Sequence, residues 1–289
     1  MEIICLNGEF MRQEDARIRC SDSAFLWGHS TFSTIRVEGG QLLHRDAHFQ
    51  RLFLGARQLG IPCQIDFPEL TSQCEQVLDC NQLTEARLRI TLSRGPVRQF
   101  MDDAENEPTL LITAVPLHDV AAADWERGWR LVTVPYPINE HSPLRRFKSG
   151  NYSEYLLARE YAKQQNADEG LLMNTQEFVA ECAMSNIFWF RDGVLFTPPL
   201  SSGALPGVVR QVLLKLAVKL GLQTQEKLIY PEELISADEI FCTNSTLLIM
   251  PITRIEDQFV SGGLAGAQTR ELYKRYRDLI EMELGRYKA

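Results

Sequence analysis

Four short segments of this chain carry residue types that can do chemistry, although each has an ordinary structural explanation when taken alone. Lys148 lies in the sequence FKSGNY (residues 147–152), where a lysine is usually a solvated residue of a turn. Glu181 lies between two apolar stretches of residues 179–189, so its carboxylate needs a cationic partner, and a salt bridge to an arginine would suffice. Together these two segments supply one amine and one carboxylate in an apolar setting.

The other two segments could bind an anion. Residues 48–52 (HFQRL) fall on a predicted helix, where Arg51 would ordinarily extend into water. Residues 205–210 (LPGVVR) predict the start of another helix. The first N–H groups of a helix are unpaired and point toward an anion when one is present, although a plain helix start is the common alternative.

Several widespread reaction classes have no motif here. The sequence contains neither G-x-G-x-x-G after a strand nor G-x-x-x-x-G-K-[ST], and it has no H-E-x-x-H and no G-x-S-x-G. Its five histidines show no metal-ligand spacing, so no metal site is expected. What remains is chemistry that rests on one lysine and a bound organic cofactor.

Composition and charge exclude some partners. The chain has 289 residues, of which 45% are hydrophobic and 24% charged, and its net charge is −8. No block of Lys and Arg is present, which argues against nucleic acid and against anionic membranes. Seven scattered cysteines without a C-x-x-C pair, and no signal-peptide pattern, indicate a cytoplasmic protein.

The elements that must position these segments follow from periodicity and turn residues. An Asn7-Gly8 turn predicts a hairpin over residues 3–10, and a second hairpin is expected over residues 32–44. Further elements are expected as helices over residues 46–60, 67–80, 152–165, 207–220 and from 268, and as strands over residues 87–93, 109–115, 129–134, 170–173 and 187–190.

The order of these elements indicates an α+β fold in two lobes, because strands and helices mix without regular βαβ alternation. Residues 1–117 are expected to form a smaller N-terminal domain. Residues 118–127 are short, Ala-rich and weakly patterned, which predicts a linker. Residues 128–289 would form a larger domain that carries Lys148.

Together, in this order and at these separations, the four segments resemble the class IV (fold type IV) pyridoxal-phosphate enzymes. That family includes branched-chain aminotransferases, D-amino-acid aminotransferases and 4-amino-4-deoxychorismate lyases. The most specific pieces are K-x-x-N at Lys148, E-x-x-x-x-N-[IV]-F from Glu181, and L-P-G-x-x-R at residues 205–210. The resemblance implies the two-domain D-amino-acid aminotransferase-like architecture, pyridoxal 5′-phosphate (PLP) as cofactor, and a homodimer.

The resemblance also implies a role for each residue around the cofactor ring. Lys148 would form the internal aldimine and then act as the base that moves the substrate proton, giving a quinonoid. Glu181 would pair with the pyridine nitrogen and keep it protonated. Tyr152 would approach the phenolic oxygen.

The cofactor phosphate would be held at three places. Arg51 would grip it with a fork of donors, and the N–H groups of Val208 and Val209 would face it at the helix start after Gly207. Ser245 falls where relatives place a hydroxyl on the phosphate. Many relatives carry Thr where Val209 stands, so one hydroxyl contact is missing here.

The substrate-facing residues favour the lyase, which converts 4-amino-4-deoxychorismate to 4-aminobenzoate and pyruvate in folate biosynthesis. Residues 32–36 (FSTIR) lack the Glu that class IV aminotransferases often carry, and Ser33 and Thr34 are hydroxyl residues as in many lyases. Thr34 or Ser33 is expected to position or protonate the enolpyruvyl group. The residues expected to contact the substrate are Phe32, Ser33, Arg98, Asn244 and Thr246.

Two alternatives stay open at this point. Leu205-Pro206-Gly207 looks more like the branched-chain aminotransferases, so a class IV aminotransferase acting on D-amino acids or branched-chain L-amino acids is the second hypothesis. A non-catalytic PLP-binding protein is the third, and it would leave the presence of both Lys148 and Glu181 unexplained.

Overall fold

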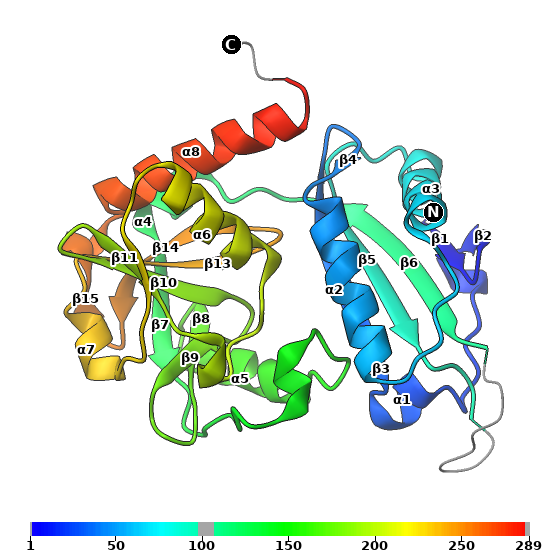
Figure 1. Ribbon diagram of the computed structural model, residues 1–289, viewed down its shortest axis with the longest axis horizontal. Coiled ribbons are helices and arrows are strands. Elements are labelled where there is room, and N and C mark those ends of the chain that lie inside the picture. The colour runs from blue at the N-terminus through cyan, green and yellow to red at the C-terminus, as the bar shows by residue number, and fades with distance from the viewer. Residues whose placement is uncertain (1, 98–106, 287–289) are drawn as a thin grey trace. The chain divides into compact units, whose positions relative to one another are not determined.

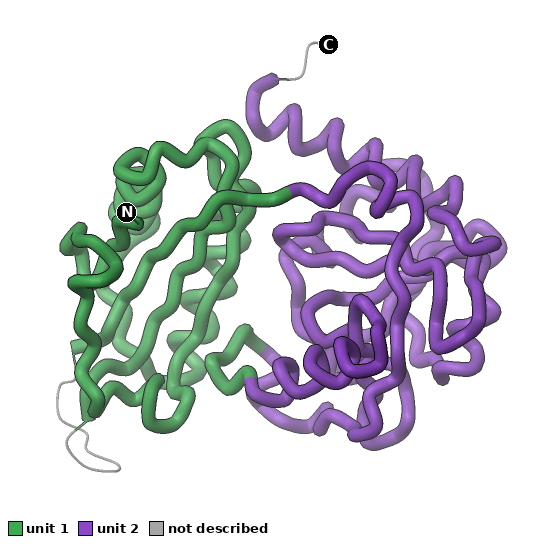
Figure 2. The backbone as a smooth tube through the Cα atoms, turned by 180° about the vertical axis from the view of Figure 1, so that it is seen from behind, with its two compact units in different colours: residues 1–118, 147–152 green, residues 119–146, 153–289 purple. Residues whose placement is uncertain are grey.

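The chain folds into two compact units, and each is described here by itself (Figure 2). The computed structural model describes residues 2–97 and 107–286. Unit 1 consists of Met1–His118 and Phe147–Tyr152, and unit 2 of Asp119–Arg146 and Ser153–Ala289. The expected boundaries differ from this division in two places. The segment that carries Lys148 groups with unit 1, and residues 122–127 of the expected linker form a helix of unit 2.

Unit 1 is an antiparallel sheet with two long helices on one face (Figure 1). Its six strands lie in the order β2-β1-β6-β5-β3-β4. The elements are β1 (Ile3–Leu6), β2 (Glu9–Arg12), η1 (Gln13–Asp15), α1 (Ser23–Trp27), β3 (Ser30–Glu38), β4 (Gln41–Leu42), α2 (Arg45–Gln58), α3 (Phe67–Cys80), β5 (Ala86–Ser93) and β6 (Thr109–Pro116).

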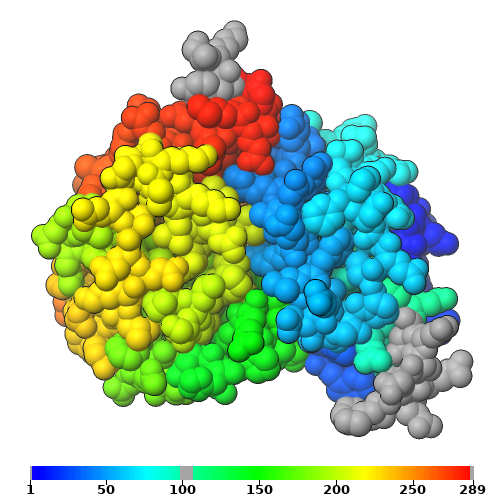
Figure 3. All heavy atoms as spheres, viewed as in Figure 1, coloured from blue at the N-terminus to red at the C-terminus, as the bar shows by residue number. Residues whose placement is uncertain are grey.

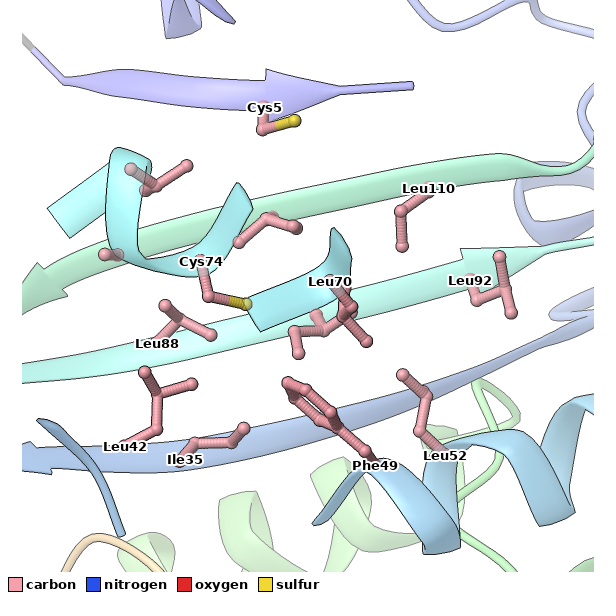
Figure 4. Packing of buried hydrophobic residues seen from close by; sticks show 14 of the residues in the cluster. Cys5, Ile35, Leu42, Phe49, Leu52, Leu70, Cys74, Leu88, Leu92 and Leu110 are labelled. Carbon is pink, nitrogen blue, oxygen red and sulfur yellow. The ribbon is translucent and has the colours of Figure 1, made fainter. Parts of the chain in front are cut away.

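The core of unit 1 lies between this sheet and the helices α2 and α3. Alternate residues of β3 and β5 point into it, and the helices contribute apolar side chains at helical spacing. Figure 4 shows the cluster, with Phe49 and Leu52 of α2 beside Ile35 of β3. α3 begins after Asp66, whose side chain accepts a hydrogen bond from the backbone N–H of Glu69.

Unit 2 is built on a nine-stranded mixed sheet in the order β12-β11-β10-β13-β14-β7-β8-β9, with β15 paired to β14. Its strands are β7 (Trp129–Thr133), β8 (Glu169–Met173), β9 (Val179–Cys182), β10 (Asn186–Arg191), β11 (Val194–Thr197), β12 (Thr224–Glu226), β13 (Glu239–Asn244), β14 (Leu248–Ile255) and β15 (Gln258–Phe259). Its helices are α4 (Ala122–Arg127), η2 (Pro143–Arg146), α5 (Ser153–Gln164), η3 (Leu200–Ser202), α6 (Val208–Lys219), α7 (Pro231–Ile235), η4 (Ser261–Gly263) and α8 (Ala267–Glu283).

The helices of unit 2 bury one side and leave the other in water. α8 buries Leu272, Tyr276 and Ile280, while its outer side (red) is open to solvent in the space-filling view (Figure 3). Two apolar clusters pack against the sheet, and Trp189 is among the largest fully buried side chains. Over residues 2–97 and 107–286, no helix combines the length and apolar character needed to cross a membrane.

Candidate active site

The Lys148 segment is attached to strand β3, 117 residues earlier in the chain. The Lys148 carbonyl accepts hydrogen bonds from the Phe32 N–H and from the Thr31 hydroxyl, both at 3.0 Å. Gly150 donates its N–H to the carbonyl of Ser30 at 2.7 Å, and a Cβ at this glycine would lie 2.0 Å from the Ser30 hydroxyl oxygen. These contacts explain why Lys148 belongs to unit 1.

The Lys148 amine is half-buried among aromatic rings. Its Nζ lies 4.8 Å from the ring centre of Phe32, 5.1 Å from the ring centre of Tyr152 and 3.5 Å from the Tyr152 hydroxyl. The two rings meet edge to face, with their centres 5.3 Å apart. The structure therefore brings Lys148, Phe32 and Tyr152 together, as the sequence predicts. The contacts are favourable to an ammonium group and keep the amine close to a phenol.

A fourth residue of this cluster, Arg89 on β5, was not predicted from the sequence. Its guanidinium carbon lies 3.8 Å from the ring centre of Phe32, and its Nε donates to the Thr91 hydroxyl at 3.1 Å. Arg89 is paired across the sheet with Thr34. The only sequence signal is that polar residues alternate with the apolar core residues of this strand. The alternation predicts that the polar residues share one face of the sheet, but not which contacts they make there.

Strand β3 presents its predicted substrate residues on two different faces. Ile35 points into the core beneath α2, and Ser33, two residues away, lies on the same face. Phe32 and Thr34 lie on the opposite face, together with Arg89. Ser33 is fully buried and bonded to α2, so the structure separates it from Thr34, whereas the sequence groups the two together.

Helix α2 carries the predicted phosphate ligand. Arg51 donates from Nη2 to the Ser33 hydroxyl at 3.3 Å, and its Nε is a buried donor without an acceptor within the described residues. Burial lowers the pKa of Arg51 to about 10, an effect that Tyr152 opposes. Among residues 2–97 and 107–286, no carboxylate pairs with Arg51. A buried guanidinium group without a carboxylate partner is stabilised when an anion binds to it.

The carboxylate of Glu181, on β9 of unit 2, is buried and held by three donors. The Tyr155 hydroxyl donates to Oε1 at 2.9 Å, and Oε2 accepts from the Leu205 N–H at 2.9 Å and from Asn186 Nδ2 at 3.3 Å. Tyr155 in turn accepts a 2.6 Å hydrogen bond from Arg145. These donors favour the ionised carboxylate, which suits pairing with a protonated ring nitrogen.

The start of α6 has no capping side chain, and its glycine lets the Asn186 side chain approach the backbone closely. Gly207 is the N-cap residue and has no side chain to cap the helix, so the first N–H groups, those of Val208 and Val209, are not satisfied by a capping side chain. A Cβ at Gly207 would lie 2.0 Å from Oδ1 of Asn186. Arg210 of the same motif is buried and pairs with Glu226, so its role is structural.

The loop between β13 and β14 contains Asn244 and Thr246, two of the predicted substrate contacts. Its Oδ1 accepts hydrogen bonds from the Thr246 N–H and hydroxyl and from the Leu247 N–H, at 2.8–3.0 Å. Its Nδ2 donates to the Ser185 hydroxyl at 3.1 Å. Asn244 therefore holds its own loop together, and Thr246 is part of that turn. Ser245 lies in the same loop, and Arg98 lies outside the described residues.

These features fit PLP when each unit is tested separately. Unit 1 offers a half-buried amine beside a phenol, together with a buried arginine donor without an acceptor. Unit 2 offers a buried carboxylate and an uncapped helix start. The sequence predicted most of these residues, but it did not predict Tyr155, Arg145 and Arg89.

Known proteins with related sequences are consistent with this assignment. The family model described as "Amino-transferase class IV" matches residues 30–255. A putative branched-chain-amino-acid aminotransferase of Methanocaldococcus jannaschii is 30% identical over 96% of each chain. A D-alanine aminotransferase of Staphylococcus epidermidis is 28% identical over 97% of this chain and 99% of its own.

Three solved structures superpose on most of this chain. The branched-chain amino acid aminotransferase of Escherichia coli superposes with a TM-score of 0.91 at 29% identity, over 96% of this chain and 94% of its own. The T.th. branched-chain amino acid aminotransferase with pyridoxamine 5′-phosphate gives 0.90 at 25% identity, over 99% and 95%. A putative 4-amino-4-deoxychorismate lyase from Legionella pneumophila gives 0.85 at 25% identity, over 92% and 96%.

Proposed function

Because this chain belongs to the class IV aminotransferase family and has its fold, we propose that it transfers the amino group of an amino acid to a 2-oxo acid. The predicted family, α+β fold and cofactor are confirmed, and PLP is the cofactor. The preference for a lyase is not confirmed, since more of the similar proteins are aminotransferases.

The observation that carries the proposal is the Lys148 amine set between Phe32 and Tyr152, with Arg89 on the same face.

PLP, when bound, supplies the electron sink that stabilises negative charge at the substrate carbon. Within this proposal, Lys148 holds the cofactor and moves a proton to and from that carbon. Tyr152 keeps a hydroxyl 3.5 Å from Nζ, where it can hold or exchange a proton.

Each unit offers its own anchor for the cofactor. In unit 2, the Glu181 carboxylate, which is held in place by Tyr155, Asn186 and Leu205, would accept a hydrogen bond from the protonated ring nitrogen. In unit 1, Arg51 would bind the phosphate through its buried Nε, which has no acceptor among the described residues.

The cationic face of β5 supports an anionic substrate. Arg89 lies over Phe32, beside the lysine, and Arg87 is the next residue of the same face. Both are exposed in the structure. Amino acids and 2-oxo acids carry a carboxylate, and arginine binds carboxylates through two parallel hydrogen bonds.

The lyase reaction is the second candidate, and one residue favours it. Thr34 shares the face of Phe32 and Arg89 and is only partly buried, so its hydroxyl can reach a substrate. A hydroxyl there suits the protonation of a leaving enolpyruvyl group. The Legionella structure, whose printed name is that of a putative lyase, supports keeping this candidate.

The deciding experiment supplies the purified, PLP-loaded protein with two sets of substrates. One set pairs branched-chain L-amino acids or D-alanine with 2-oxoglutarate or pyruvate, and the product 2-oxo acid is measured. The other is 4-amino-4-deoxychorismate, with 4-aminobenzoate fluorescence as readout. We expect turnover in the first set. Rapid 4-aminobenzoate formation without amino transfer would replace the proposal with the lyase.

Compartment and assembly are proposed together with the activity. All seven cysteines are free thiols, which supports a reducing cytoplasm. A homodimer is proposed because α1 exposes Phe25, Leu26 and Trp27 in succession.

A further inference from the structure

Three polar side chains of unit 1 form a chain of hydrogen bonds beneath the sheet. Ser33 Oγ lies 2.8 Å from His48 Nδ1, and Arg51 Nη2 donates to the same oxygen at 3.3 Å. Ser33 and His48 are almost fully buried, with exposed fractions of 0% and 1%. Ser33 comes from β3, while His48 and Arg51 lie one turn apart on α2.

The direction of this chain follows from which groups can donate. A guanidinium group has donors and no acceptor, so Ser33 Oγ is the acceptor from Arg51. We assign the Ser33 hydroxyl hydrogen to His48 Nδ1, because this arrangement uses the hydroxyl both as an acceptor and as a donor. Burial, together with the charge of Arg51, lowers the pKa of His48 well below its usual value, so the ring is neutral. The proton of the neutral ring therefore lies on Nε2.

This arrangement restricts the arginine side chain. A free arginine has many rotamers, and fixing one of its nitrogens reduces the entropy lost when an anion binds. The contact with Ser33 engages one nitrogen of Arg51 and leaves its buried Nε without an acceptor among the described residues. A neutral His48 at this position also avoids placing a second positive charge beside the guanidinium.

We propose that Ser33 and His48 are positioning residues for Arg51, which hold its guanidinium ready for the phosphate group of the cofactor and do not contact the substrate. The inference rests on the proposed phosphate-binding role of Arg51. It separates Ser33 from Thr34, which lies on the opposite face of β3 with Phe32. It also means that His48 acts through Arg51 and is not a proton carrier for the reaction.

The test compares PLP with pyridoxal, which lacks the phosphate. Holoenzyme loaded with either compound is diluted in series, and the loss of the visible cofactor band gives a dissociation constant. Ser33→Ala and His48→Leu should each weaken PLP binding about tenfold, the effect of one charge-assisted hydrogen bond, and leave pyridoxal binding unchanged. His48→Asn should retain wild-type affinity, because its side-chain oxygen can accept where Nδ1 did.

Two further variants keep the result interpretable. Ser93→Ala removes another buried hydroxyl of the same sheet, bonded to Asp22, and should change neither constant. In an Arg51→Lys background, Ser33→Ala should have no additional effect on PLP affinity, because the group that it positions is gone. Equal weakening of PLP and pyridoxal, or additive effects in the double variant, would overturn the inference.

Failure of the inference is separable from failure of the proposed function. A wild-type protein that shows no visible band with PLP would contradict the proposed function itself. A wild type that binds PLP and amino acids normally, with Ser33→Ala binding PLP equally well, would contradict only the positioning role.

Discussion

At the scale of single residues, Lys148 is the amine whose surroundings suit covalent chemistry. It is attached through its backbone to β3, and its Nζ is set 3.5 Å from the Tyr152 hydroxyl. Lys148→Ala should abolish the visible band of the bound cofactor and lower amino transfer at least about a thousandfold, since both the covalent link and the base are lost. Absorption spectra and initial rates measure the two effects.

The matched control for Lys148 is Lys163→Ala, which removes an exposed lysine of α5. It should leave the spectrum and the rate unchanged. A Lys148→Ala protein that keeps both the band and the rate would show that another amine holds the cofactor.

Glu169 gives a prediction about stability. It is buried on β8 and accepts hydrogen bonds from the Gly170 and Met184 N–H groups, and burial raises its pKa to about 7. The unfolded chain ionises this group at about pH 4.3, so the folded state binds more protons between that pH and the folded pKa. Its contribution to stability is therefore full below the unfolded pKa and is lost as pH rises through the folded one.

Glu169→Gln removes this titration. The difference in unfolding free energy between pH 5 and pH 8 should change by about 3 kcal/mol relative to the wild type, with the variant losing less stability as pH rises. Urea unfolding at the two pH values measures it, and Glu160→Gln on the exposed side of α5 is the control. An identical pH dependence in wild type and Glu169→Gln would contradict the assignment.

At the scale of elements, strand β5 divides its residues between the core and a cationic face. Leu88 and Ile90 enter the core, while Arg87 and Arg89 point away from it. Arg89→Leu should raise KM for the 2-oxo acid about tenfold or more with a smaller change in kcat, because a carboxylate contact is lost from binding. Steady-state kinetics with varied 2-oxoglutarate measure both constants.

The comparison variant for Arg89 is Arg57→Leu, which removes an exposed arginine near the end of α2. It should leave both constants at wild-type values. If Arg89→Leu and Arg57→Leu behave alike, the face of β5 does not bind the substrate.

Local elements were predictable because their signals are local. The helix over residues 67–80 has the predicted bounds, and the Asn7-Gly8 hairpin forms as expected. The predicted helix over residues 46–60 begins one residue earlier, at Arg45: His44 is the N-cap residue in a left-handed conformation, and Asp46 falls in the first turn. Side-chain periodicity fixes the existence of a helix better than its first residue.

Only some of the site residues could be predicted from the sequence. Lys148, Arg51 and Glu181 carry family motifs, whereas Arg89 and Tyr155 enter through long-range pairing that no local pattern encodes. The two neighbouring hydroxyls of β3 could have been separated by the alternation of a strand. That would have required knowing which face α2 covers.

At the scale of the whole molecule, the division into units follows contacts between distant residues. Ser149 pairs with Thr31 as an isolated bridge, and this contact places residues 147–152 in unit 1 although the chain on both sides belongs to unit 2. Composition along the chain gives no sign of such an exchange, so a single boundary was the natural expectation.

Assembly gives the last prediction. Phe25 in α1 is 77% exposed, and the next two residues, Leu26 and Trp27, are exposed large hydrophobic residues as well, so α1 offers apolar surface that a partner could cover. Phe25→Glu should convert a dimer into monomers, because a charge in a buried apolar interface lacks a partner. Light scattering after size exclusion gives the mass. Phe259→Glu, at a residue on β15 that is 70% exposed, is the control and should leave the mass unchanged. A wild type that is already a monomer would contradict the proposed homodimer, and the apolar surface of α1 would then need another partner.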